Sequence, residues 1–190
     1  MLRELVAKNR SYRRFYENEK PSSEQLKAWI DLARLGASGR NAQTIKYMII
    51  LSEEMCESVF EQLAWAGYLQ DWDGPRKGER PSAYVVMVND DALGKNYFSD
   101  DGIAAQNLLL GAVERGFGGC IIRAFKEKEL RELLKIEAGY SIIQLIALGK
   151  PKEEVVIEEM NNGDIKYWRD ENGVHHVPKR GIDEIILEEL

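Results

Sequence analysis

Residues 99–125 run SDDGIAAQNLLLGAVERGFGGCIIRAF, and this stretch predicts a helix, a glycine turn and a buried strand in succession. Ser99 or Asp100 is suited to cap the helix, and apolar residues recur at helical spacing through about residue 115. Gly116–Gly119 ends the helix, and Cys120–Ile122 is a short apolar run typical of a buried strand. The centre of the chain therefore combines helices and strands in one layered fold.

The same patterns extend to both sides of this stretch. Helical periodicity predicts further helices over residues 2–10, 22–35, 52–66 and 126–134, while apolar runs predict strands over residues 45–51, 83–88 and 142–148. Residues 68–81, with two glycines and two prolines around Trp72, predict an exposed loop. With 190 residues the chain is expected to form a single α+β domain over residues 1–190.

Composition excludes several classes of protein. Hydrophobic residues make up 44% of the chain, but no apolar run has the length needed to span a bilayer, so no membrane association is expected. The first residues lack the apolar core of a secretory signal, which favours a cytoplasmic protein. A net charge of −6 provides no overall basic field, so nucleic acid is not an expected partner.

Neither a metal site nor a protein nucleophile is indicated. Cys56 and Cys120 lack metal-ligand spacing and are expected to be reduced, buried thiols, while His175 and His176 are adjacent and point to different sides of the backbone. The dinucleotide-binding, P-loop and nucleophile-elbow motifs are all missing from the sequence. We therefore expect no metal, and a bound cofactor to supply any chemistry.

Basic residues gather in two places despite the overall negative charge. Arg10, Arg13 and Arg14 lie within five residues, and Lys179 and Arg180 form a second cluster near the other end. Adjacent guanidinium groups repel one another unless solvent or an anion such as a phosphate lies between them. A small anionic ligand is one interpretation, and a solvated basic turn is the other.

Two further segments are suited to a flat heterocycle. Residues 38–43 offer hydroxyl and amide groups that both donate and accept hydrogen bonds, and the glycines of residues 116–125 allow close approach of the backbone. The structural alternatives are a helix C-terminus in which Gly39 adopts positive φ, and a tight turn between helix and strand.

Taken in order, these segments resemble the motifs of the nitroreductase family of flavoproteins. The resemblance rests on the segments at residues 10–15, 37–43, 101–108, 116–125, 147–151 and 177–180. It departs from the family at Ala37 and Thr44, where many members have proline, and the segment 68–81 is short where larger members carry a helical excursion.

The resemblance implies a mostly antiparallel sheet flanked by helices, an interlocked homodimer, and an FMN at each end of the subunit interface. Arg10, Ser11 and Arg13 would contact the flavin, Lys179 and Arg180 its phosphate, and the backbone of Ile121, Ile122, Arg123 and Ala124 its ring near N5. Ser38, Gly39, Arg40 and Asn41 would reach the flavin of the other subunit. Tyr12, Arg14 and Gln43 complete the set of implied cofactor-binding residues.

The implied activity is a ping-pong transfer of hydride from NAD(P)H through flavin N5 to an electron acceptor such as a nitroaromatic, a quinone or a flavin. No side chain is expected to be catalytic in its own right, although Arg13 is suited to stabilise negative charge at flavin N1 and O2. The alternatives are a dehalogenase, a dehydrogenase or a flavin-fragmenting enzyme of the same fold, or a non-catalytic flavin carrier or sensor.

Two predictions rest on the residues themselves. Tyr68 and Trp72, in the predicted loop, are expected to cover a flat substrate and to influence the choice of acceptor, and a plain packing role is the alternative. The segment 182–190 contains Ile182, Ile185, Ile186 and Leu190, an apolar set that a small domain cannot readily cover alone. This apolar end supports assembly as a homodimer.

Overall fold

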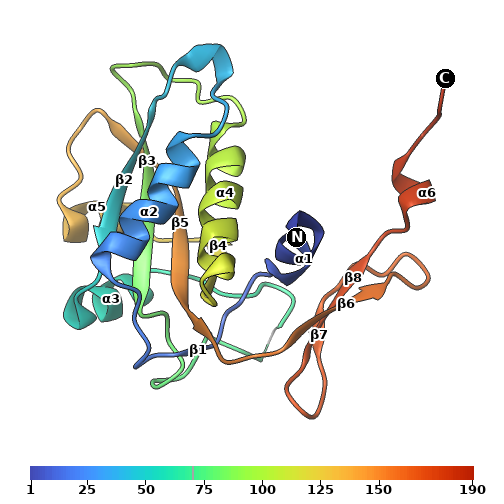
Figure 1. Ribbon diagram of the computed structural model, residues 1–190. Coiled ribbons are helices and arrows are strands. Elements are labelled where there is room, and N and C mark those ends of the chain that lie inside the picture. Colours follow the sequence, from blue (N-terminus) through green and yellow to red (C-terminus); the bar gives the residue numbers. More distant parts are fainter. Residues whose placement is uncertain (70) are drawn as a thin grey trace.

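The computed structural model describes residues 1–69 and 71–190 and is shown in Figure 1. Its elements, in chain order, are α1 (Leu2–Lys8), β1 (Phe15–Tyr16), α2 (Ser23–Arg34), a 3-10 turn η1 (Gly39–Asn41), β2 (Ile45–Ile50), α3 (Glu53–Phe60), β3 (Ala83–Asp90), α4 (Asp100–Glu114), β4 (Gly118–Ile122), α5 (Glu127–Leu134), β5 (Tyr140–Pro151), β6 (Val155–Glu159), β7 (Trp168–Arg169), β8 (His175–Lys179) and α6 (Ile182–Ile185).

The central sheet is antiparallel throughout. β3 lies between β2 and β5, and β4 pairs with β5 on the opposite edge. β1 adds two residues at the far end of β5, where Phe15 lies opposite Pro151. The predicted α+β fold with a mostly antiparallel sheet is confirmed.

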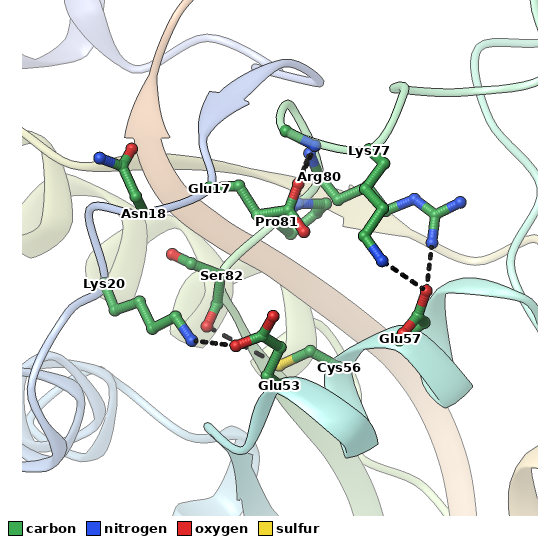
Figure 2. A pocket seen from close by; sticks show the side chains of 11 residues that line it. Glu17, Asn18, Lys20, Glu53, Cys56, Glu57, Lys77, Arg80, Pro81 and Ser82 are labelled. Atoms are coloured by element: carbon green, nitrogen blue, oxygen red, sulfur yellow. Dashed lines mark hydrogen bonds and ion pairs between the residues drawn. The ribbon is translucent and has the colours of Figure 1, made fainter.

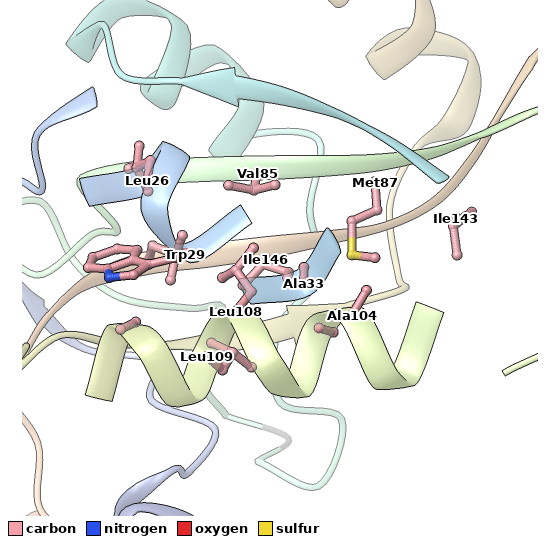
Figure 3. Close-up of a cluster of buried hydrophobic side chains, with 14 residues drawn as sticks. Leu26, Trp29, Ala33, Val85, Met87, Ala104, Leu108, Leu109, Ile143 and Ile146 are labelled. Carbon is pink, nitrogen blue, oxygen red and sulfur yellow. The ribbon is translucent and has the colours of Figure 1, made fainter. Parts of the chain in front are cut away.

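Helices cover both faces of this sheet because its central strands are apolar on both sides. Val85 and Met87 of β3 pack with Leu108 of α4 and with α2 in one cluster, which Figure 3 shows. Tyr84 and Val86, which alternate with them along β3, pack against α3 and α5 in a second cluster. The result is three layers, with α2 and α4 on one face and α3 and α5 on the other.

The predicted helices are present, with one correction. α2 begins with the expected capping box, in which Gln25 N donates to Ser22 Oγ at 3.2 Å and Ser22 N donates to Gln25 Oε1 at 2.8 Å. The helix predicted over residues 52–66 ends at Phe60 instead. Beyond it, Ala64 N donates to Ala124 O at 2.9 Å, so the backbone pairs with the segment after β4 rather than continuing the helix.

A second, small sheet follows β5 and was not predicted from the sequence. β8 pairs in parallel with β6 and antiparallel with β7. We call residues 152–190 the C-terminal arm; Figure 1 shows it extending away from the central sheet to α6 and the exposed end of the chain. Among the described residues, no helix is both long enough and apolar enough to span a bilayer.

Candidate functional site

A hollow of about 210 Å³ lies beside the C-terminal end of β4. Arg13 and the segment Cys120–Ala124 line it on one side, and residues 64–67 line it on the other. The two walls are joined by the bond from Ala64 N to Ala124 O and by an isolated bridge between Leu63 and Phe125. The side chain of Ile121 is 40% exposed here, so the floor of the hollow is accessible.

The N-terminal motif is fastened to the beginning of β4. Tyr12 N donates to Gly119 O at 3.0 Å, and Ser11 forms an isolated parallel bridge with Gly119. The ring of Tyr12 lies so close to Gly118 that a β-carbon at that position would collide with it. At Gly118 the close approach is therefore made by the protein's own tyrosine, and it brings the next residue, Arg13, to the hollow.

Arg13 lies in a partly buried place, where polar and aromatic groups contact its guanidinium. Its Nη1 donates to Ser11 O at 3.1 Å and lies 3.3 Å from His175 Nε2, and its guanidinium carbon lies 4.9 Å from the centre of the Tyr167 ring. Burial, followed by the positive charges of Arg13 and Arg169, lowers the pKa of His175 to about 4. His175 is therefore neutral at pH 7, and its Nε2 accepts the bond from Arg13.

Arg14 contacts the segment 68–81 instead of the hollow. Its Nε and Nη2 each donate to the Glu79 carboxylate at 2.8 Å, a bidentate pair that fixes the end of the segment 68–81. The bonds from Arg14, together with the nearby Lys152, lower the pKa of Glu79 to about 2. The guanidinium of Arg14 thus holds the loop in this chain, and its contact with a cofactor stays a prediction.

Glu153 organises this region and was not singled out from the sequence. Its buried carboxylate accepts from Arg13 N at 2.5 Å, from Arg14 N at 3.2 Å and from Arg169 Nη2 at 3.0 Å. One acidic side chain therefore ties the N-terminal motif to the C-terminal arm. Nothing in its sequence context separates it from the exposed Glu154 beside it.

The polar loop at residues 38–43 lies at the N-terminus of α4. Asp100 accepts from Ser38 Oγ at 2.7 Å and from Gly39 N at 2.8 Å. Positive φ occurs at Arg40, Asn41 and Gln43, so the interpretation that gave it to Gly39 is wrong. Gly39 is needed instead because the ring of Phe98 occupies the space that a side chain would fill.

Arg123 is linked to the same end of α4. Its guanidinium forms an ion pair with Asp101, and its Nε donates to Gln144 Oε1 at 3.0 Å. These bonds restrain the Arg123 side chain toward α4 and β5, while residues 121–124 line the hollow. Asp100, which holds the polar loop, was considered in the sequence only as a helix cap, and Asp101, which pairs with Arg123, only as part of the segment 101–108.

Lys179 and Arg180 lie on the C-terminal arm, at and just after the end of β8. His175, at the first position of β8, contacts Arg13, and Lys179 is four residues further along, roughly 13 Å at the usual rise of a strand. Arg180 pairs with Glu184 at 3.3 Å. Arg10 donates to Val6 O at 2.9 Å, and its buried Nε has no partner among the described residues.

Tyr68 and Trp72 line a larger neighbouring hollow of about 620 Å³. It shares Gly67 with the hollow beside β4, so the predicted substrate residues lie next to the predicted cofactor residues. The described part of the loop packs on the arm: the rings of Tyr68 and Tyr167 are 4.9 Å apart, and the Arg169 guanidinium carbon lies 4.8 Å from the Trp72 ring centre. Gln70, within this loop, lies outside the described residues.

A separate hollow of about 620 Å³ lies between α3 and the end of the loop (Figure 2). Its charged groups pair with one another, since Lys20 contacts Glu53 at 3.3 Å and Arg80 contacts Glu57 at 3.4 Å. Burial raises the pKa of Cys56 to about 11, so this thiol is protonated and unreactive at pH 7. Neither basic cluster of the sequence reaches this hollow, and we do not assign the site to it.

Comparison with known proteins decides the family. The sequence profile of the nitroreductase family matches residues 6–150, which include the N-terminal motif, the polar loop and the floor of the hollow. The chain belongs to the nitroreductase family. In this family member, the described residues contain no group of three His, Cys, Asp or Glu side chains placed to hold a metal ion.

Two relatives of this chain are named as NAD(P)H nitroreductases. An NADH dehydrogenase/NAD(P)H nitroreductase of Archaeoglobus fulgidus is 28% identical over 149 residues, which cover 74% of this chain and 80% of that protein. The NAD(P)H nitroreductase MhqN of Bacillus subtilis is 23% identical over 183 residues, covering 79% of this chain and 88% of that protein.

Solved structures share the fold. A nitroreductase family protein of Streptococcus pneumoniae superposes with a TM-score of 0.68 at 19% identity and covers 100% of both chains. A nitroreductase of Exiguobacterium sibiricum, solved in complex with FMN, gives a TM-score of 0.66 at 20% identity and covers 80% of this chain and 89% of that one.

Proposed function

We propose that this protein is an FMN-dependent oxidoreductase that takes hydride from NAD(P)H and passes electrons to a small acceptor. One observation carries the proposal: Arg13 of the N-terminal motif and residues 121–124 after β4, which are far apart in sequence, line one hollow. Family membership and the names of the two relatives support the same class of reaction.

The residues around the hollow fit an anionic flavin. The backbone of Ile121–Ala124 would lie against the ring, and Arg13 would face its polar edge with a fixed positive charge. The buried Nε of Arg10, which has no partner among the described residues, is a donor available to a phosphate. These donors belong to the protein's largest cluster of arginines near one end of the chain.

When bound, FMN supplies hydride chemistry at N5. The task of the protein is to hold charge and exclude water. Arg13 would stabilise negative charge on the pyrimidine side, and its position is set by Ser11, His175 and the backbone bond to Glu153. Neutral His175 accepts a bond from Arg13 without cancelling its charge.

We further propose that the working form is a homodimer. The apolar residues of the last segment are exposed in the single chain, with Leu187 fully so, and exposed apolar surface of this kind is normally covered by a partner. Lys179 and Arg180 directly precede this segment, so a partner that covers it would lie close to these two cations. The polar loop at residues 38–43 is exposed at Arg40 and Asn41, and it is accessible to a second subunit.

The test is to reconstitute the purified protein with FMN, remove the excess by gel filtration, and add NADH or NADPH without oxygen. We expect a yellow protein that bleaches on addition of the reductant and recovers its colour with a quinone. A protein that stays yellow acts as a carrier or sensor, and a colourless protein that takes up no FMN refutes the proposal.

A further inference from the structure

The hollow beside Tyr68 adjoins a second hollow, and neither is lined by Arg13 or residues 121–124, to which the flavin ring is assigned. The hollow of about 620 Å³ shares Trp72 and Arg169 with a smaller one of about 260 Å³ that also includes Arg14, Arg76 and Glu79. At its other end it shares Gly67 with the hollow at β4. We call the surface that the described lining residues of these two adjoining hollows form the side groove.

The side groove is positively charged within a chain of net charge −6. Arg14, Arg76, Lys166 and Arg169 line it, against two acids, Asp71 and Glu79. Glu79 is already bound by Arg14, and Arg169 is bound by Glu153. Among residues 1–69 and 71–190, Arg76 and Lys166 form no ion pair, so their charges remain available to a ligand.

Aromatic rings line the same groove. Trp168 stacks on His176 with ring centres 4.0 Å apart and planes 9° from parallel, which fixes one face of the indole. Trp168 is nevertheless 46% exposed and lines the larger hollow. Trp72 lines both hollows and is held by Arg169. Restrained rings beside free cations are suited to a ligand that has both a flat base and phosphates.

We propose that the side groove binds the adenosine diphosphate half of the reduced nicotinamide dinucleotide. This inference rests on the proposed function, because the groove opens at Gly67 into the hollow where the nicotinamide would meet the flavin. Arg76 and Lys166 bind the diphosphate, and Trp168 or Trp72 stacks on the adenine. The larger hollow, about 620 Å³, falls within the volume range of small-molecule sites.

The binding test uses adenosine 5′-diphosphate, which carries no hydride, titrated by calorimetry into the FMN-loaded protein. We expect saturable binding that is weakened about fivefold in Arg76→Gln and in Lys166→Gln, since each loses a charge-assisted contact at an accessible site. The matched controls, Arg115→Gln and Lys128→Gln, remove exposed charges away from the groove and should leave the affinity unchanged. No binding of the diphosphate, or equal effects in variants and controls, overturns the proposal.

Kinetics separate this inference from the proposed function. The KM for NADH or NADPH should rise about fivefold in the two groove variants, whereas the rate with 1-benzyl-1,4-dihydronicotinamide, which lacks the adenosine diphosphate half, should not change. Failure of wild-type protein to oxidise either reductant refutes the proposed function itself. A groove effect seen only with an anionic acceptor such as 4-nitrobenzoate, and absent with a neutral quinone and with the dinucleotide, assigns the groove to the acceptor and overturns the inference.

Discussion

Replacing Glu153 should weaken both the fold and the site, because one buried carboxylate serves two backbone donors and one guanidinium. Its side chain is fully buried, and it joins Arg13 and Arg14 to Arg169. Removing one member of a buried ion pair typically costs about 3–5 kcal/mol, since the remaining charge and donors lose their partner. In a chain of this length the loss corresponds to a fall in Tm of roughly 6–20 °C.

The variants to compare are Glu153→Ala and Glu153→Gln, with Glu154→Ala as the matched control at the exposed neighbouring position. Glutamine keeps one oxygen for the two backbone donors, but it places an amide NH2 opposite Arg169 and so loses both the charge and the acceptor there. We expect its stability to lie between those of wild type and alanine. Urea unfolding followed by far-UV circular dichroism gives the free energies, and flavin content after dialysis reports the site. If Glu153→Ala and Glu154→Ala unfold within about 0.5 kcal/mol of one another, the assigned role of Glu153 is wrong.

Four further outcomes are expected. Arg10→Ala and Lys179→Ala should each lower flavin content after dialysis by weakening an anion contact worth about 1.5–3 kcal/mol. Full flavin occupancy in both variants would show that the phosphate site is wrongly assigned. Trp72→Ala should change the ratio of kcat/KM among several acceptors, and a uniform change would argue against selection. The pKa of His175 is about 4 in the folded protein and 6.5 ordinarily, so its contribution to the free energy of unfolding is up to about 3 kcal/mol. This contribution is present above pH 6.5 and is lost as the pH falls toward 4. The free energies of unfolding of wild type and His175→Gln, measured with urea, should therefore differ by a changing amount over that range. Deleting residues after Arg180 should lower Tm, release FMN and shift sedimentation toward monomer, and a stable yellow monomer would contradict the dimer proposal.

The central strands and most helices could be predicted because the spacing of apolar residues along the sequence follows their buried faces. β3 is buried on both faces and is therefore an unbroken apolar run, and α2 has a capping box and a clear stripe. The end of α3 was predicted wrongly because Leu63 and Ala66 continue the helical period, while the bond from Ala64 to Ala124 is a tertiary contact that local sequence cannot show.

The strands of the C-terminal arm were not predicted for a different reason. β8 is HHVPK, with a proline and two histidines in five residues, and β7 has only two residues, so neither shows an apolar alternation. Its strands are specified by pairing with β6 and by the contact between His175 and Arg13.

The binding motifs were accessible from the sequence, whereas the groups that orient them were not. Arg13 belongs to a cluster of arginines that stands out by spacing alone. Glu153, Asp100 and Asp101 are three of 32 acidic residues, and only the tertiary structure shows which ones are buried against a donor. Sequence reasoning thus finds donors gathered for a ligand more readily than the single acceptors that hold those donors in place.

The most direct test of the central claim is the crystal structure of the protein after reconstitution with FMN. We predict that the flavin ring lies against Ile121–Ala124 with the Arg13 guanidinium at its pyrimidine edge, and that Lys179 or Arg180 reaches the phosphate. A flavin bound elsewhere, such as in the hollow of Figure 2 beside Cys56, would contradict the account.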